Sequence, residues 1–178
     1  MRSTIATLVL ASIPALAADP PAKKVTKTPA VLEVASTAFT DQNPIPAEHT
    51  CDGDDQPPPL SWSRVPVNTK SIAILVDDPD APNGSFTHWL VTGIPATTSS
   101  LTGTLPQGAV AASNDKGTPG YAGPCPPSGA HRYQFHVYAL DTTLPSVLTK
   151  ADFIKQIKGH VLATGQLTGI YRRRNASS

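Results

Sequence analysis

Four short segments carry most of the side chains that could do chemistry: residues 49–62, 77–82, 88–89 and 120–133. The second reads Asp-Asp-Pro-Asp-Ala-Pro, so three carboxylates fall within four positions of a chain that two prolines stiffen. Carboxylates this close repel one another and need hydrogen-bond donors or cations nearby. The alternative interpretation is a turn at the end of a strand, with all three acids in solvent.

Histidines follow in the third and fourth segments. On a regular strand, His88 shares a face with Phe86 and Leu90, and a histidine among apolar neighbours is more often a core residue than a ligand. His131 and Tyr133 share a face at the start of another strand, after a loop rich in Gly and Pro. Glycines let such a loop turn backbone N–H groups toward one point. Two imidazoles, a phenol and loop amides would together suit an anion such as phosphate.

Strands are the main elements available to position these groups. Short apolar or β-branched runs bounded by Pro and Gly predict strands at residues 31–39, 71–76, 86–94, 133–140 and 163–171. The run 71–76 is nearly all apolar, which is typical of a strand covered on both faces. The chain holds 19 prolines in 178 residues, which disfavours helical bundles. We expect a mainly β fold, a sandwich with a few peripheral helices.

One helix is expected near the C-terminus. Thr149 is a candidate N-cap with Asp152 three residues later. The helix would present one apolar face, formed by Phe153, Ile154, Ile157 and Val161.

The ends of the chain differ from its body. Residues 1–18 combine Arg2 with an apolar run and an Ala-Leu-Ala site, which predicts a signal peptide and a periplasmic or secreted protein; the alternative is a buried N-terminal helix. Residues 19–30 read as a Pro- and Lys-rich linker, residues 31–172 as the folded domain, and residues 173–178 as a basic, polar tail.

Charge is nearly balanced over the whole chain, with 14 Lys+Arg against 13 Asp+Glu. This balance argues against nucleic acid as a partner. Residues 30–171 hold seven basic and twelve acidic residues, a net charge of −5, so the ends are positive. Positive ends predict a peripheral contact with an anionic membrane surface.

Several motifs occur together in a fixed order. They are Asp78-Pro-Asp-Ala-Pro82, His88, and Gly123-Pro-Cys-Pro-Pro-x-Gly-x-His-Arg-Tyr133, joined by the segments 58–62 and 163–171. In this arrangement the chain resembles the phosphatidylethanolamine-binding protein family, most closely its bacterial Raf-kinase-inhibitor-like branch. The resemblance covers residues 31–172.

The resemblance implies a sandwich of two antiparallel β-sheets with an anion pocket at one end. That pocket would bind phosphate or a phospholipid headgroup such as phosphorylethanolamine, without a metal or another cofactor. By motif match, its wall would consist of Asp78, Asp80, His88, Gly123, Pro126, Pro127, His131 and Tyr133.

The same match suggests a role for each side chain. The two histidines would donate hydrogen bonds to the anion, and Tyr133 would shape the wall or add a hydroxyl donor. Asp78 and Asp80 would accept from the histidines or from a ligand ammonium group. The glycine and the two prolines would set the backbone amides and the shape of the loop, and Arg132, on the opposite face of its strand, would be structural.

Cys51 and Cys125 are the two cysteines of the chain. In an exported protein they could form a disulfide bond that ties the 49–62 loop to the pocket loop. Two separate thiols are the alternative. Metal ligation by a cysteine together with a histidine is a further possibility, but no C-x-x-C spacing supports it.

The leading functional hypothesis is a non-enzymatic binder of small anions or phospholipid headgroups. The alternative is a protein-interaction or inhibitor module that acts on a kinase-like, protease or envelope partner. Catalysis is disfavoured because the chain has no G-x-S-x-G turn and no H-E-x-x-H helix. The resemblance also allows a dimer.

Overall fold

The structure is a computed structural model that describes residues 28–144 and 149–173. The predicted signal peptide at 1–18, most of the predicted linker and nearly all of the predicted tail lie outside these residues. Within the described ranges, no helix has the length and apolar character needed to cross a bilayer.

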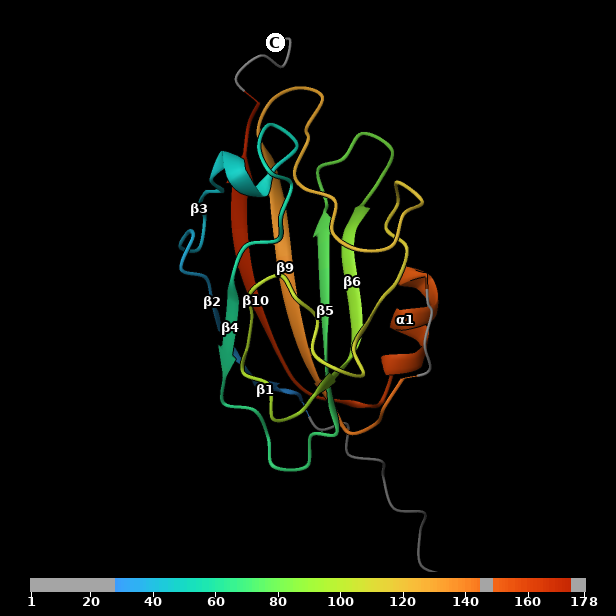
Figure 1. Ribbon diagram of the computed structural model, residues 1–178. Helices are drawn as coiled ribbons and strands as arrows, with labels where there is room; N and C mark the ends of the chain where they lie inside the picture. The colour runs from blue at the N-terminus through green and yellow to red at the C-terminus, as the bar shows by residue number, and fades with distance from the viewer. Residues whose placement is uncertain (1–27, 145–148, 174–178) are drawn as a thin grey trace, which may run out of the picture.

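The described part of the chain forms two sheets, one α-helix and a short 3-10 helix (Figure 1). The larger sheet runs in the order β1-β10-β9-β5-β6-β8, and β3 also pairs with β10. Its strands are β1 (Ala30–Val31), β3 (Asn43–Pro44), β5 (Ser71–Asp78), β6 (Phe86–Pro95), β8 (Val110–Ala111), β9 (His131–Leu140) and β10 (Val161–Tyr171). The smaller sheet is β2-β4-β7, with β2 (Glu33–Ala35), β4 (Leu60–Ser63) and β7 (Ser100–Leu101).

Most strand pairs are antiparallel, and the two short strands β1 and β3 add to β10 in parallel. The predicted mainly β sandwich is therefore confirmed. The predicted strand at 31–39 is instead split into β1 and β2, which belong to different sheets.

Strand β5 is buried at all eight positions because both faces of the larger sheet are covered. Ile72, Ile74 and Val76 join the core between the two sheets. Ala73 and Leu75 face the other way, into a second core beneath the helix. The molecule thus has three layers, in which the helix lies on the opposite side of the larger sheet from the smaller sheet.

The helix α1 (Lys150–Ile157) begins as predicted, because the Thr149 side chain accepts from the backbone N–H of Asp152. Its apolar face is narrower than expected. Phe153 and Ile157 are buried, whereas Ile154 is 46% exposed. Val161 is not helical, since the helix ends at Ile157 and Val161 begins β10.

Three loops meet at one end of the larger sheet, at the top of Figure 1. They are the 45–59 loop, which includes the short 3-10 helix η1 (Ala47–His49), the 79–85 loop after β5, and the 112–130 loop before β9. We call this the pocket end. All four segments that the sequence singled out reach it.

Candidate functional site

A cavity of about 340 Å³ lies at the pocket end. Its lining residues are Asp78, Ala81, Pro82, Phe86, His88, Lys116, Cys125, Pro126, Pro127, His131 and Tyr133. Six of the eight predicted wall residues are among them; Asp80 and Gly123 are not.

The last residue of β5 and the first of β9 form the floor of the cavity. Asp78 and His131 lie on the same face of the sheet as Val76 and Tyr133, because side chains alternate along each strand. The Nδ1 atom of His131 lies 2.6 Å from Oδ2 of Asp78, and both side chains are buried. The other carboxylate oxygen of Asp78 accepts from the backbone N–H of Asp80 at 2.8 Å. Asp78 therefore fixes the orientation of the His131 ring.

A β-bulge in β6 brings His88 into the cavity. Val76 pairs with Trp89, but the next residue, Asp77, pairs with Thr87, so His88 is an extra residue on β6. The bulge changes the alternation of side chains, so His88 and Trp89 both point toward the smaller-sheet side. Leu90 points into the core beneath α1, so the prediction that His88 and Leu90 share a face is wrong.

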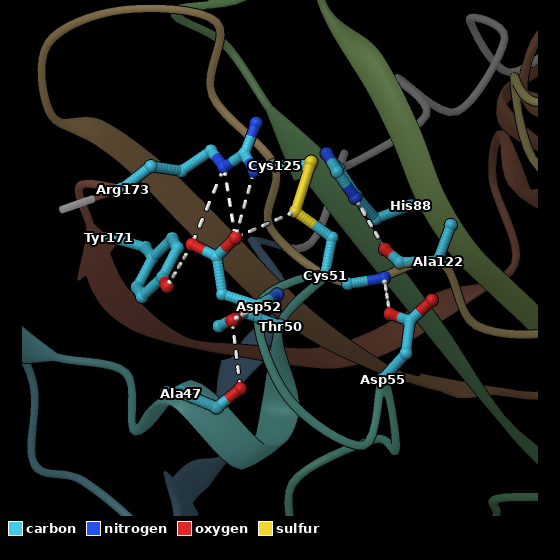
Figure 2. The surroundings of a disulfide bond; sticks show 11 residues. Ala47, Thr50, Cys51, Asp52, Asp55, His88, Ala122, Cys125, Tyr171 and Arg173 are labelled. Carbon is cyan, nitrogen blue, oxygen red and sulfur yellow. Dashed lines mark hydrogen bonds and ion pairs between the residues drawn. A yellow bond between two sulfur atoms is a disulfide. The ribbon is translucent and has the colours of Figure 1, made fainter. Parts of the chain in front are cut away.

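The 112–130 loop holds the bulged residue. The Nδ1 atom of His88 donates to the carbonyl oxygen of Ala122 at 2.5 Å, and the Ala122 N–H donates back to the carbonyl of His88 at 2.9 Å. Figure 2 shows the side-chain bond. Burial lowers the pKa of His88, and the Ala122 carbonyl and Asp78 only partly oppose this effect. His88 is therefore biased toward its neutral form.

Tyr133 forms the inner wall beside His88. Its ring meets the His88 ring edge-on, with centroids 5.1 Å apart. Its hydroxyl is buried and has no partner of good hydrogen-bond geometry in the described part of the chain. Burial raises the pKa of Tyr133, and the backbone of Cys125 opposes this only weakly. The hydroxyl therefore keeps its proton and supplies a neutral polar group.

Lys116 is a charged lining residue that the sequence reasoning missed. It is exposed and lies in the 112–130 loop, yet it lines the cavity. Within the described residues it is the one Lys or Arg in the lining. Its local sequence, Asn-Asp-Lys-Gly, predicts only a turn. No motif signals the role, because the loop sets the position of Lys116.

Asp80 takes a different partner from the one predicted. Its carboxylate accepts from the backbone N–H and the guanidinium of Arg132, with Oδ1 2.7 Å from Nη2 and Oδ2 2.9 Å from Nε. Both side chains are partly exposed at the pocket end of the two central strands β5 and β9. The predicted acceptance from the histidines is thus not observed for Asp80, because a bidentate arginine fills both of its oxygens.

Gly123 and its neighbours also act differently from the prediction. The N–H of Gly123 donates to Oδ1 of Asp55 at 2.6 Å, and the amides of Ala122 and Gly120 bond within the protein as well. A Cβ on Gly123 would lie 2.8 Å from the Cα of Thr50. Gly123 is needed for close packing of two loops, rather than for turning amides toward a ligand.

A disulfide joins Cys51 to Cys125, as the exported-protein hypothesis anticipated (Figure 2). The N–H of Cys51 also donates to the carbonyl of Pro124 at 3.1 Å. Next to the bridge, Asp52 accepts from the hydroxyl of Tyr171 at 2.7 Å and from Nε of Arg173 at 3.0 Å. These contacts tie the pocket loop, the 45–59 loop and the end of β10 together, so the wall that contains Cys125 is fixed in place.

No group of three or more His, Cys, Asp or Glu side chains arranged to hold a metal ion occurs among residues 28–144 and 149–173. The polar lining of the cavity instead consists of two imidazoles, one carboxylate, one phenol and one ammonium group. This set can exchange hydrogen bonds with a small ligand of either charge, and the fixed rings determine where those bonds form.

The fold and the site together define a β-sandwich protein with a pocket at the end of its larger sheet. Residues 35–172 match the family model described as phosphatidylethanolamine-binding protein. The chain therefore belongs to the phosphatidylethanolamine-binding protein family, which confirms the resemblance noted in the sequence.

Relatives agree with this assignment. A protein of Methanothermobacter thermautotrophicus named UPF0098 protein is 47% identical over 151 residues, which are 80% of this chain and 99% of that protein. A Mycobacterium tuberculosis protein that carries the name lipoprotein LppC is 42% identical over 142 residues, 78% of this chain and 65% of its own length.

Solved structures agree as well. The crystal structure of YbcL from Escherichia coli, described as a new member of the mammalian PEBP family, has a TM-score of 0.76 and 37% identity. It covers 82% of this chain and 100% of YbcL. The crystal structure of the PEBP homologue CT736 from Chlamydia trachomatis gives the same TM-score and identity, over 80% of this chain and 98% of that one.

Proposed function

We propose that this protein binds a small phosphate-type anion, either free phosphate or the headgroup of a phospholipid, in the cavity at the pocket end. One observation carries the proposal: two buried histidines line the same cavity, and each has its Nδ1 atom fixed by a protein acceptor. Neither Nε2 atom has a hydrogen-bond partner among the described residues. A ligand in the cavity is the natural partner for both.

Local hydrogen-bonding groups, rather than net charge, would hold the anion. Lys116 contributes a positive charge at the exposed rim, and Asp78 contributes a buried negative charge that is hydrogen-bonded to His131. The domain as a whole is acidic, so long-range attraction for anions is weak. Affinity must therefore come from local hydrogen bonds, which favours an anion with several oxygens.

The volume supports a small ligand. A cavity of about 340 Å³ is at the lower end of the range for small-molecule sites. It suits a phosphate group with a short substituent such as ethanolamine. The acyl chains of a bound phospholipid would have to remain outside.

A titration tests the proposal. We expect inorganic phosphate or phosphorylethanolamine at millimolar concentration to shift the ring NMR signals of His88 and His131. His131→Ala should weaken binding at least about tenfold, since it removes a buried hydrogen-bonding group that lines the cavity. His160→Ala is the matched control, because His160 is exposed and paired with Asp141 outside the cavity. Absence of any shift at His88 and His131 with either ligand would overturn the proposal.

We also propose that the protein works outside the cytoplasm. The Cys51–Cys125 disulfide supports this location, because such bonds persist in oxidising compartments. The relative named as a lipoprotein supports an envelope location in the same way. Bacterial expression of the full chain and of a form without residues 1–18, followed by fractionation and a free-thiol assay, tests it. Only the full chain should leave the cytoplasm and lack free thiols.

A further inference from the structure

We propose that His88 accepts, rather than donates, a hydrogen bond from the ligand, so that the pocket selects anions that still carry a proton. The site would then bind protonated phosphate and reject sulfate, an anion of the same shape that has no proton near neutral pH. This inference rests on the proposed anion-binding function and specifies the chemical form of the ligand.

The hydrogen bond to Ala122 determines the tautomer of His88. A carbonyl oxygen can only accept, so the proton of the neutral ring must be on Nδ1. The Nε2 atom then carries a lone pair. Because His88 lines the cavity and this atom has no partner in the described part of the chain, the lone pair is available to a ligand. Figure 2 shows the second ring nitrogen pointing away from Ala122.

The surroundings of His88 keep the ring neutral. Its contacts are apolar or uncharged on two sides, with Phe86 at a ring distance of 4.8 Å and Tyr133 at 5.1 Å. Among the charged groups that face it, Asp78 and Asp115 favour the cationic ring, while Lys116 disfavours it. The effect of burial is larger than that of the two carboxylates, so the pKa of His88 lies below the ordinary value for histidine.

His131 differs from His88 in the partner that holds it. Its Nδ1 atom is bonded to the carboxylate of Asp78, whereas His88 is bonded to a neutral carbonyl. The P–OH group of a monoprotonated phosphate would donate to Nε2 of His88, while Lys116, the ammonium group of the lining, suits a charged oxygen.

Sulfate has no proton to offer to His88. Its oxygens would place lone pairs against the lone pair of Nε2, in a site where a buried polar atom without a partner is costly. A phosphate monoester retains its second proton to about pH 6, so its protonated form is available near neutral pH. Discrimination between the two anions thus follows from one fixed tautomer.

Calorimetric titration with sodium phosphate and sodium sulfate at pH 6.5 and equal ionic strength tests the inference. We expect phosphate to bind at least about tenfold more tightly than sulfate. As the pH is lowered further and His88 gains its proton, sulfate affinity should rise and the ratio should shrink. Equal affinity for the two anions would overturn the inference and leave the proposed function standing. Binding of neither anion would overturn both.

Two further measurements assign the effect to His88. The variant His88→Asn keeps an amide that can donate to the Ala122 carbonyl but removes Nε2, so its preference for phosphate should fall to about threefold or less. The control His160→Asn should keep the full preference. In the wild-type protein, the ¹⁵N shifts of the His88 ring should report an unprotonated Nε2 at pH 7, a readout that does not depend on the variant folding. A protonated Nε2, or an unchanged preference in folded His88→Asn, would contradict the assignment.

Discussion

Asp77 and Asp78 are neighbours on β5, yet they lie in two regions of the molecule with opposite character. Because side chains alternate along the strand, Asp77 faces the helix side of the larger sheet and Asp78 faces the cavity. Asp77 lies 2.7 Å from Nζ of Lys150, 2.8 Å from Oγ of Ser85 and 3.2 Å from Nε2 of His136. Asp78 has one side-chain partner, His131.

The difference shows how the same residue types give a structural cluster on one face and a binding site on the other. Around Asp77, a lysine and a hydroxyl both donate to Oδ2 of the carboxylate, and α1 covers the sheet beside them. Around Asp78, the 112–130 loop contributes Cys125, Pro126 and Pro127 to the wall but leaves a cavity, which His131 also lines. The element that covers each acid–histidine pair, rather than the pair itself, separates the two outcomes.

The largest expected effect is on the helix side. Burial alone would raise the pKa of Asp77, but hydrogen bonds from His136, Lys150 and Ser85 outweigh it and hold the pKa well below the ordinary range. Asp77→Asn should therefore lower the free energy of unfolding by about 2–3 kcal/mol at pH 7, measured in urea. Phosphate affinity should not change.

The pH dependence of Asp77→Asn checks the cause. A carboxyl with a lowered pKa in the folded state stabilises the protein above about pH 4, the unfolded value, and loses that contribution as the pH falls further. The gap between wild type and variant should therefore be constant from pH 7 to pH 5 and shrink below pH 4. Asp141→Asn, at an exposed pair with His160, is the control and should show little change. A gap at pH 2 as large as that at pH 7 would mean that packing, not charge, is responsible.

The second-largest effect on stability is expected on the cavity side of the larger sheet. Asp78→Asn should cost about 1–2 kcal/mol of stability, less than Asp77→Asn, because one side-chain partner is affected rather than three. Phosphate affinity should fall about tenfold, since His131 loses the carboxylate that orients its ring. Calorimetry and urea unfolding on the same samples measure both. Unchanged or tighter phosphate binding would remove Asp78 from the site.

Much of this arrangement could be predicted from the sequence, because local patterns encode it. The apolar run at 71–76 identifies the doubly covered strand β5, and Thr149 with Asp152 identifies the start of α1. The motifs at 78–82 and 123–133 identify the segments that line the cavity. In each of these cases the signal lies within a few neighbouring residues.

The rest depends on contacts between distant parts of the chain. The bulge at His88 is visible only in the pairing of β5 with β6. The sequence of β6 contains no local signal that predicts it. Lys116 reaches the cavity through the course of a long loop. The pairing of Asp80 with Arg132 joins positions 52 residues apart, so the sequence offered no reason to prefer it over the histidines.

The smallest effect on stability is expected at the pair of Asp80 and Arg132, on the cavity side of the comparison. The hydrogen bonds from Arg132 outweigh burial and lower the pKa of Asp80 to about 2. Because the pair is largely in solvent, Asp80→Asn should cost less than about 1 kcal/mol at pH 7, less still in high salt, with a pH dependence confined to about pH 2–4. Urea unfolding at two salt concentrations measures this. A tenfold loss of phosphate affinity in Asp80→Asn would restore the role that the motif predicted for Asp80, and the cavity side would then use two carboxylates rather than one.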